Sequence, residues 1–195
     1  MAKFFGNLHL VLLTGLVLAL GMMFKFAGIS EGSLPVNASS VLSWLHLFFG
    51  IVWIGLLYYL NFVQVPTMPA IPAELKGGVT GYIAPKVLFF FRYGALLTVI
   101  TGLAIAFVKG YGHRAMTLNG VTANENLIGI GMWLALIMAF NVWFIIWPAQ
   151  QKILGLVEAS AEEKAAAAPR ALYASRTNVL LSLPMLYAMV SANLG

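Results

Sequence analysis

The stretch VLSWLHLFFGIVWIGLLYYLNFVQVP, residues 41–66, decides the fold of this 195-residue chain. It contains no aspartate, glutamate, lysine or arginine, and as a helix it is long enough to cross a hydrocarbon core of about 30 Å. Its only ionisable side chain is that of His46. An imidazole in lipid needs a partner, a ligand or a metal, because an unsatisfied polar group costs free energy there. The stretch therefore predicts a membrane-spanning helix that carries a candidate functional residue.

One face of this helix collects small and polar side chains. Counting from His46 in steps of three and four places Gly50 and Trp53 on the same face, followed by Asn61 and Gln64. A glycine one turn from a histidine removes the side chain that would block a flat ligand. We therefore interpret this face as the candidate functional wall.

Two interpretations of His46 stay open at this point. In the structural one, the imidazole donates to a carbonyl or hydroxyl of a neighbouring helix and fixes packing, as polar side chains do between membrane helices. In the functional one, His46 is an axial ligand of haem iron or handles protons, and the adjacent Gly50 favours it.

The composition indicates an integral membrane protein. The chain is 61% hydrophobic and 9% charged, whereas soluble domains carry about 25% charged residues, and the mean hydropathy is +0.91. Cysteine is absent, which excludes disulfides, thiolate metal sites, iron–sulfur clusters and covalent haem attachment. The net charge of +5 accompanies hydrophobic spans, so it indicates orientation and contact with anionic lipids of the bilayer. Nucleic-acid binding has no support.

The hydrophobic runs predict a single all-α transmembrane domain over residues 1–195, built as a bundle of five transmembrane helices. The prolines and glycines of residues 66–85 predict a loop there, and residues 110–126 predict a second, polar one. Residues 152–174 predict an interfacial helix between spans four and five, broken near Pro169. The predicted spans cover residues 8–27, 41–65, 86–109, 127–147 and 176–194.

The third span combines a small-residue stripe with one charged side chain. Gly94, Thr98 and Gly102 recur every four residues, which predicts the close approach of another helix. Arg92 lies inside the same span. Two interpretations of Arg92 stay open: it snorkels to the interface, or it faces inward and binds an anionic group such as a haem propionate or an acidic substrate.

Basic residues predict the orientation of the bundle. Seven lysines and arginines fall on one side of the five spans and three on the other, which places the N-terminus in the cytoplasm. Five polar side chains then gather toward the cytoplasmic side as candidates for a substrate or headgroup site. These are Asn61, Gln64, Asn141, Arg176 and Asn178.

Several segments resemble a known family. They are WLHLFFGIVWIG (44–55), FFRYGALLTVITGL (90–103), NVWFIIWPAQQ (141–151) and SRTNVLLSLPMLYAMV (175–190). They are similar to the membrane domain of bacterial urate oxidases of the PuuD type, over spans two to five. The WLHxxxGxxWIG pattern also resembles the histidine helix of small haem-binding membrane protoporphyrinogen oxidases.

The first resemblance implies a multi-pass protein of the bacterial cytoplasmic membrane, with urate oxidation and electron transfer to a c-type cytochrome domain. Because this sequence has no cysteine, the electron acceptor is expected to be a separate cytochrome. Our first hypothesis is a redox protein with haem b on His46, with Gly50 and Trp53 beside it and Arg92 neutralising a propionate. It acts on urate or a related small acid. The alternative is a non-catalytic accessory subunit of a larger respiratory or photosynthetic membrane complex.

The charge asymmetry generates a topology prediction. Cysteines introduced in place of Ser33 and Thr122 should react with a membrane-impermeant reagent added outside the cell, and one in place of Glu162 should not. The opposite labelling pattern would overturn the orientation.

Overall fold

The computed structural model describes residues 2–26 and 38–194, and these divide into two compact units, Met1–Val41 and Leu42–Gly195. The first unit contains the short helix α1 (Ala2–Phe5) and the helix α2 (Leu8–Phe26). The Asn7 side chain caps α2 by accepting from the backbone N–H of His9, at 3.1 Å. Residues 28–40, between the first two predicted spans, lie largely outside the described residues.

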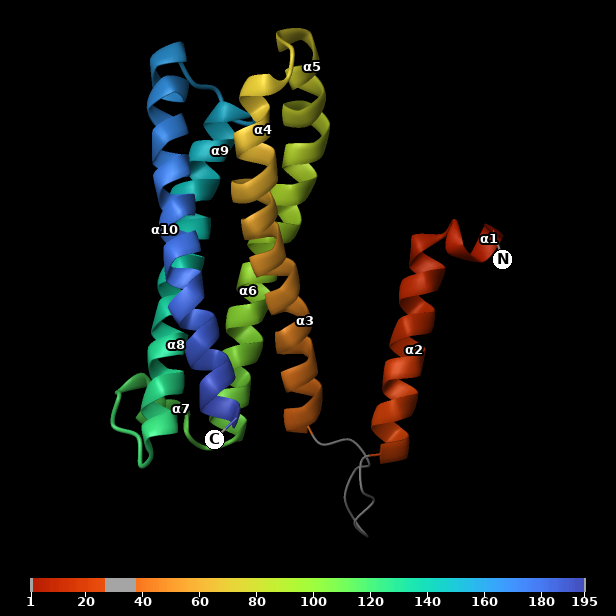
Figure 1. Cartoon of the computed structure of the whole chain (residues 1–195), viewed down its shortest axis with the longest axis vertical. Coiled ribbons are helices and arrows are strands. Elements are labelled where there is room, and N and C mark those ends of the chain that lie inside the picture. Colours follow the sequence, from red (N-terminus) through yellow and green to blue (C-terminus); the bar gives the residue numbers. More distant parts are fainter. Residues whose placement is uncertain (1, 27–37, 195) are drawn as a thin grey trace. The chain divides into compact units, whose positions relative to one another are not determined.

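The second unit contains four long helical stretches that lie side by side (Figure 1). Together with α2 they make five helices long and apolar enough to cross a membrane, and the described residues contain no strand. This confirms the predicted all-α fold with five candidate spans and the expected contact with the lipid bilayer. The four stretches are Ala38–Ala70, Ala73–Val108, Ala123–Ile153 and Ala161–Leu194.

Most of these stretches are composed of several helical segments, three of which are π-helical. Figure 1 shows the short segments near α4, α5 and α9 at one end of the second unit and α7 at the other. The segments are α3 (Ala38–Tyr58), η1 (Tyr59–Gln64), α4 (Val65–Thr67), η2 (Met68–Ala70), α5 (Ala73–Gly78), η3 (Val79–Ile83), α6 (Ala84–Val108), α7 (Gly112–Met116), α8 (Ala123–Phe140), η4 (Asn141–Ile146), α9 (Trp147–Ile153) and α10 (Ala161–Leu194).

The loop predicted over residues 66–85 was wrong, because helix continues through most of it. Each π segment ends two residues before a proline: Pro66 after η1, Pro85 after η3 and Pro148 after η4. A proline inside an α-helix lacks a donor, and its ring clashes with the carbonyl four residues earlier. The wider π turn relieves this clash. The prolines therefore reshape these helices instead of ending them.

The interfacial helix predicted within residues 152–174 is not a separate element. A loop follows α9, and α10 then runs unbroken through Pro169 and Pro184. Ser160 and Glu163 fix its start as a capping box: Ser160 Oγ accepts from Glu163 N at 3.1 Å, and Glu163 Oε2 accepts from Ser160 N at 3.0 Å. The alanine-rich turns that follow pack against α9, so the helix has no reason to stop at Pro169.

Small residues bring the helices of the second unit together, as predicted. A Cβ added to Gly94 would lie 3.3 Å from the backbone nitrogen of Trp53, so α6 touches the backbone of α3. On α8, a Cβ added to Gly131 would lie 3.1 Å from the Cβ of Ala188 on α10. The core of the second unit contains Trp53, Leu57, Phe91, Met138 and Val142, all with 0% exposure.

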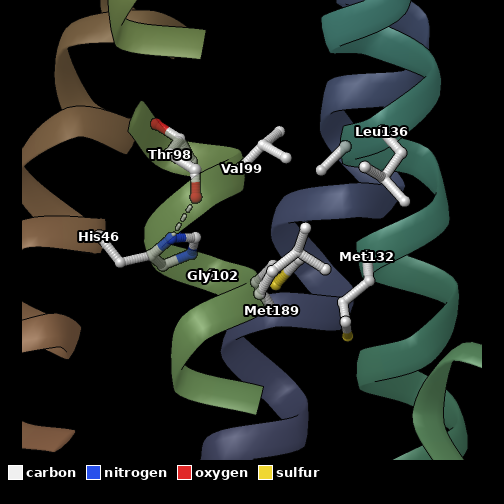
Figure 2. A pocket seen from close by; sticks show the side chains of 9 residues that line it. His46, Thr98, Val99, Gly102, Met132, Leu136 and Met189 are labelled. Carbon is white, nitrogen blue, oxygen red and sulfur yellow. Dashed lines mark hydrogen bonds between the residues drawn. The ribbon is translucent and has the colours of Figure 1, made fainter. Parts of the chain in front are cut away.

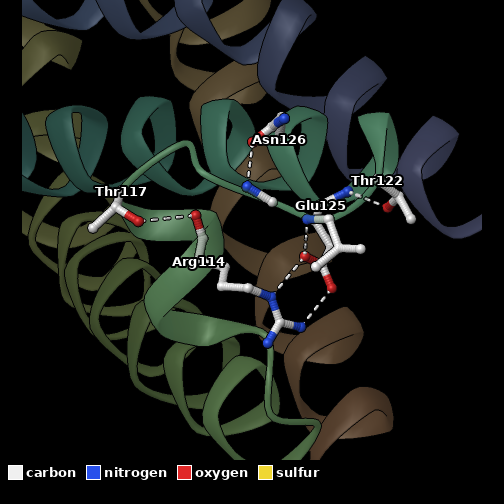
Figure 3. A network of polar contacts seen from close by, with 7 residues as sticks. Arg114, Thr117, Thr122, Glu125 and Asn126 are labelled. Atoms are coloured by element: carbon white, nitrogen blue, oxygen red, sulfur yellow. Dashed lines mark hydrogen bonds and ion pairs between the residues drawn. The ribbon is translucent and has the colours of Figure 1, made fainter.

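The predicted polar loop over residues 110–126 contains α7 and a compact network (Figure 3). Arg114 donates to both carboxylate oxygens of Glu125, at 3.0 and 2.7 Å, and this pairing raises the pKa of Arg114. Thr122 caps α8 by accepting from Glu125 N at 3.2 Å. A Cβ added to Gly129 would overlap the carbonyl of Ala115, so α7 rests directly on α8. The network thus holds the α6–α8 connection against the bundle.

Replacing Gly102 with leucine should force α3 and α6 apart. A Cβ at this position would lie 2.8 Å from His46 Cε1, and overpacking of this kind costs about 1–3 kcal/mol. Thermal unfolding in detergent measures the effect. Gly55→Leu on α3 is the matched control, because nothing lies within 4 Å of a Cβ there. Equal melting temperatures for the two variants would contradict the contact.

Candidate functional site

His46 connects α3 to α6 through one ring nitrogen. Its Nδ1 lies 2.9 Å from the carbonyl oxygen of Thr98 and 3.3 Å from Thr101 Oγ1. A carbonyl can only accept, so Nδ1 carries the proton, and in the neutral imidazole Nε2 has the free lone pair. Figure 2 shows this second nitrogen turned away from Thr98, toward Met189. A metal-ligating histidine is oriented in the same way, by a backbone carbonyl on its other nitrogen.

Three cavities surround the imidazole. The largest, of about 370 Å³, is lined by His46, Gly50 and Trp53 together, so the structure brings these three predicted residues to one site. His46 and Gly102 line two further cavities, one of about 250 Å³ and a small one of about 30 Å³. The open side of Gly50 meets only Thr98 Cγ2, at 3.9 Å from an added Cβ. The glycine therefore leaves space beside the histidine, as the sequence predicted.

Two methionines face His46 from other helices. Met189 of α10 lines all three cavities, and Met132 of α8 lines the two smaller ones (Figure 2). Their thioethers are soft ligands that suit haem iron or copper. The sequence did not predict these two methionines as candidate ligands, because a methionine in an apolar span has no feature that distinguishes it from other core residues.

The 250 Å³ cavity has a polar end. Ser43, Lys109, Tyr111 and Asn193 all line it. Lys109 is the capping residue at the end of α6, two turns beyond Gly102, so an exposed basic residue lines this cavity. Burial raises the pKa of the Tyr111 hydroxyl, so this group stays protonated and able to donate.

Arg92 lies apart from the histidine site. It precedes Gly102 by ten residues on α6, about 15 Å along the helix, and it lines none of the three cavities around His46. Its guanidinium carbon lies 3.1 Å from the ring centre of Trp147 and 5.8 Å from that of Trp143. This is a cation–π contact. The structure therefore does not bring Arg92 together with His46.

Asn61 and Gln64 lie at the far end of the same stretch and line a different cavity. This cavity measures about 410 Å³ and also contains Gln150 and Ser175. Asn61 is 4% exposed, and its Nδ2 donates to the carbonyl of Leu57 at 2.9 Å and to Ser175 Oγ at 2.8 Å. We call this space, defined by Asn61, Gln64, Gln150 and Ser175, the amide cavity.

The other predicted polar candidates have structural partners. Asn141 Nδ2 donates to Asn178 Oδ1 at 2.9 Å, and Asn178 Nδ2 donates to the carbonyl of Met138 at 3.0 Å. Both amides are buried, so they join α8 to α10. The side chain of Arg176 is exposed and lines neither the His46 cavities nor the amide cavity. The predicted polar cluster is therefore divided between a cavity, an interhelical pair and the surface.

Within the second unit, His113 lines none of the three cavities around His46. His113 is exposed on α7, and His9 belongs to the first unit. Within residues 2–26 and 38–194, no group of three or more histidine, aspartate or glutamate side chains could hold a metal ion. None of the residues that line the three cavities around His46 is acidic.

These features define a multi-pass helical membrane protein with a histidine-lined cavity inside the bundle. Residues 115–195, from α7 to the end of α10, match the family model described as urate oxidase N-terminal. Comparison with curated proteins and with solved structures gives no match. This match supports a urate oxidase N-terminal-like membrane domain over residues 115–195 and agrees with the resemblance stated from the sequence. The finer assignment to the PuuD type stays a prediction.

The structural role of the buried Asn141–Asn178 pair can be tested by comparing the stability of two variants. Asn178→Ala would leave Asn141 Nδ2 without its acceptor and remove one of the donors to the Met138 carbonyl, and it should cost about 1–2 kcal/mol of stability. Arg176→Ala, a change at an exposed neighbour on the same helix, should melt like the wild type. If Arg176→Ala were the more destabilising change, the assignment of these two roles would be wrong.

Proposed function

We propose that the protein is a membrane redox protein in which His46 ligates a b-type haem through Nε2. It oxidises urate or a related small acid and passes electrons to a separate c-type cytochrome. The observation that carries the haem proposal is the orientation of His46 by the Thr98 carbonyl, which leaves Nε2 facing the cavities. The substrate class and the cytochrome partner rest on the urate oxidase N-terminal match alone.

The residues around His46 fit a non-covalent haem. The 370 Å³ cavity is lined mostly by apolar side chains, and the missing side chain of Gly50 extends it next to the imidazole. A porphyrin is flat and apolar, so it suits such walls. Met189, which lines every cavity around His46, is a second ligand of the right chemistry.

Lys109 is a better partner for a propionate than Arg92. It lines the 250 Å³ cavity beside His46, whereas Arg92 stacks on Trp147. A haem would supply one-electron chemistry. The protein's own contribution is to orient the imidazole through Thr98 and to make room for the imidazole at Gly102. The apolar walls keep water from the iron position.

The non-catalytic alternative rests on a specific observation. The hydrogen bond from His46 Nδ1 to the Thr98 carbonyl satisfies one ring nitrogen and joins two helices, which is what an interhelical packing residue does. In that case the chain is an accessory subunit of a larger membrane complex. In either case, we propose the bacterial cytoplasmic membrane, with the N-terminus in the cytoplasm, as its location.

The haem proposal is tested by isolating the protein under mild conditions and recording its absorption spectrum with a pyridine haemochrome assay. We expect a Soret band that His46→Ala abolishes and His9→Ala leaves intact. Met189→Ala should retain haem but lower its reduction potential, because methionine ligation raises the potential.

A wild-type protein without haem or metal would overturn this proposal and favour the accessory subunit. Melting temperatures of the same variants control for unfolding: His46→Ala must lose the Soret band while still giving a cooperative transition.

A further inference from the structure

The amide cavity is polar yet carries no charge. Its 410 Å³ lie between η1, α6, η4–α9 and α10, and no lysine, arginine, histidine, aspartate or glutamate is among its lining residues. Its polar groups are the amides of Asn61, Gln64 and Gln150 and the hydroxyl of Ser175. Apolar side chains form the rest of the wall, including Leu88, Phe91 and Ile146. Such a lining suits a neutral ligand with an apolar body and a few hydrogen-bonding groups.

Two buried oxygens in this cavity have no donor. Asn61 Oδ1 and Gln64 Oε1 are buried without a hydrogen-bond partner. The orientation of the Asn61 amide is fixed, because the Leu57 carbonyl can only accept and therefore needs Nδ2 beside it. A buried acceptor without a donor costs about 1–3 kcal/mol. A ligand that donates hydrogen bonds to these oxygens would recover that free energy.

The positions of these oxygens restrict the ligand further. Both lie on the single turn η1, three residues apart, so one small ring can reach them together. Both N–H groups of Asn61 are already used, but the amides of Gln64 and Gln150 also carry N–H donors, so the cavity can serve a ligand in a hydroxyl form and in a carbonyl form. An anionic ring such as urate is disfavoured, because no cation lines the cavity to offset its charge.

We propose that the amide cavity binds the head group of a membrane-soluble quinone, with the quinol form bound more tightly than the quinone. The quinol hydroxyls donate to Asn61 Oδ1 and Gln64 Oε1, and the ring lies against the apolar wall. A quinone becomes a quinol by taking up two electrons and two protons. The quinol hydroxyls can therefore donate to amide oxygens, whereas the quinone carbonyls can only accept from amide N–H groups. This binding site lies apart from His46 and does not rest on the haem.

The test measures binding of decylubiquinol and decylubiquinone to the full chain in nanodiscs, by calorimetry without oxygen. The dimethyl ether of decylubiquinol is the matched ligand, since it keeps the ring and tail but has no donor. We expect the quinol to bind about tenfold more tightly than the ether, the amount that one lost hydrogen bond gives. Equal binding of the quinol and its ether would overturn the proposal.

Protein variants locate the site. Gln64→Leu and Gln150→Leu should each weaken quinol binding about tenfold. Gln151→Leu should leave it unchanged, because Gln151 is the neighbour of Gln150 and does not line the cavity. Gln64 Oε1 has no partner to lose, so the fold should survive, and melting temperatures check this. Ser175→Ala is a further variant, which removes the hydroxyl from the cavity. In this variant Asn61 Nδ2 keeps its hydrogen bond to the Leu57 carbonyl, so the orientation of the Asn61 amide is retained.

Quinol affinity that is unchanged in both glutamine variants would place the ligand elsewhere and overturn the proposal. Binding of urate that competes with the quinol and is weakened by Gln64→Leu would overturn it in favour of an oxopurine site. Loss of haem in His46→Ala should leave quinol affinity as in the wild type, so this proposal and the haem proposal fail separately.

Discussion

The hydrogen bond from His46 to the Thr98 carbonyl is the interaction on which the candidate site depends. In a membrane interior no water replaces a missing partner, so a polar side chain there has a strongly preferred orientation. The bond joins α3 to α6 where Gly102 removes any obstacle to the ring. It also decides which nitrogen is available, because the donor to Thr98 must be Nδ1. Nδ1 of this imidazole therefore makes the packing contact, and Nε2 of the same ring is the candidate ligand.

The helical period allowed part of this site to be predicted. Steps of three and four residues correctly placed His46, Gly50 and Trp53 at one cavity, because they lie on one uninterrupted helix. Met189 and Lys109 come from other elements, and sequence spacing contains no information on which helix will face which. The same limit applies to Asn141, whose partner Asn178 lies 37 residues away on α10.

The prolines show where local rules fail in a membrane-spanning chain. The sequence around Pro66 and Pro85 predicts a break, and in water a break costs little because exposed backbone groups bind solvent. In lipid each unpaired backbone group is expensive, so the chain widens a turn and keeps its hydrogen bonds. The π segment η1, which contains Asn61 and Gln64, is also wider than an α-helical turn, so these two residues depart from the α-helical spacing counted from His46. This change of register accompanies the separation of these amides from the histidine site.

Five of the fully buried side chains are large and apolar, and they pack together in the core of the second unit. Trp53 and Leu57 of α3, Phe91 of α6, and Met138 and Val142 of α8 and η4 have 0% exposure and occupy the level between His46 and Asn61. Interiors packed in this way have no room for a file of water molecules. Such packing opposes the passage of hydrated ions between the two cavities. A bundle packed in this way suits a membrane that holds an ion gradient, because its own core offers that gradient no aqueous route across.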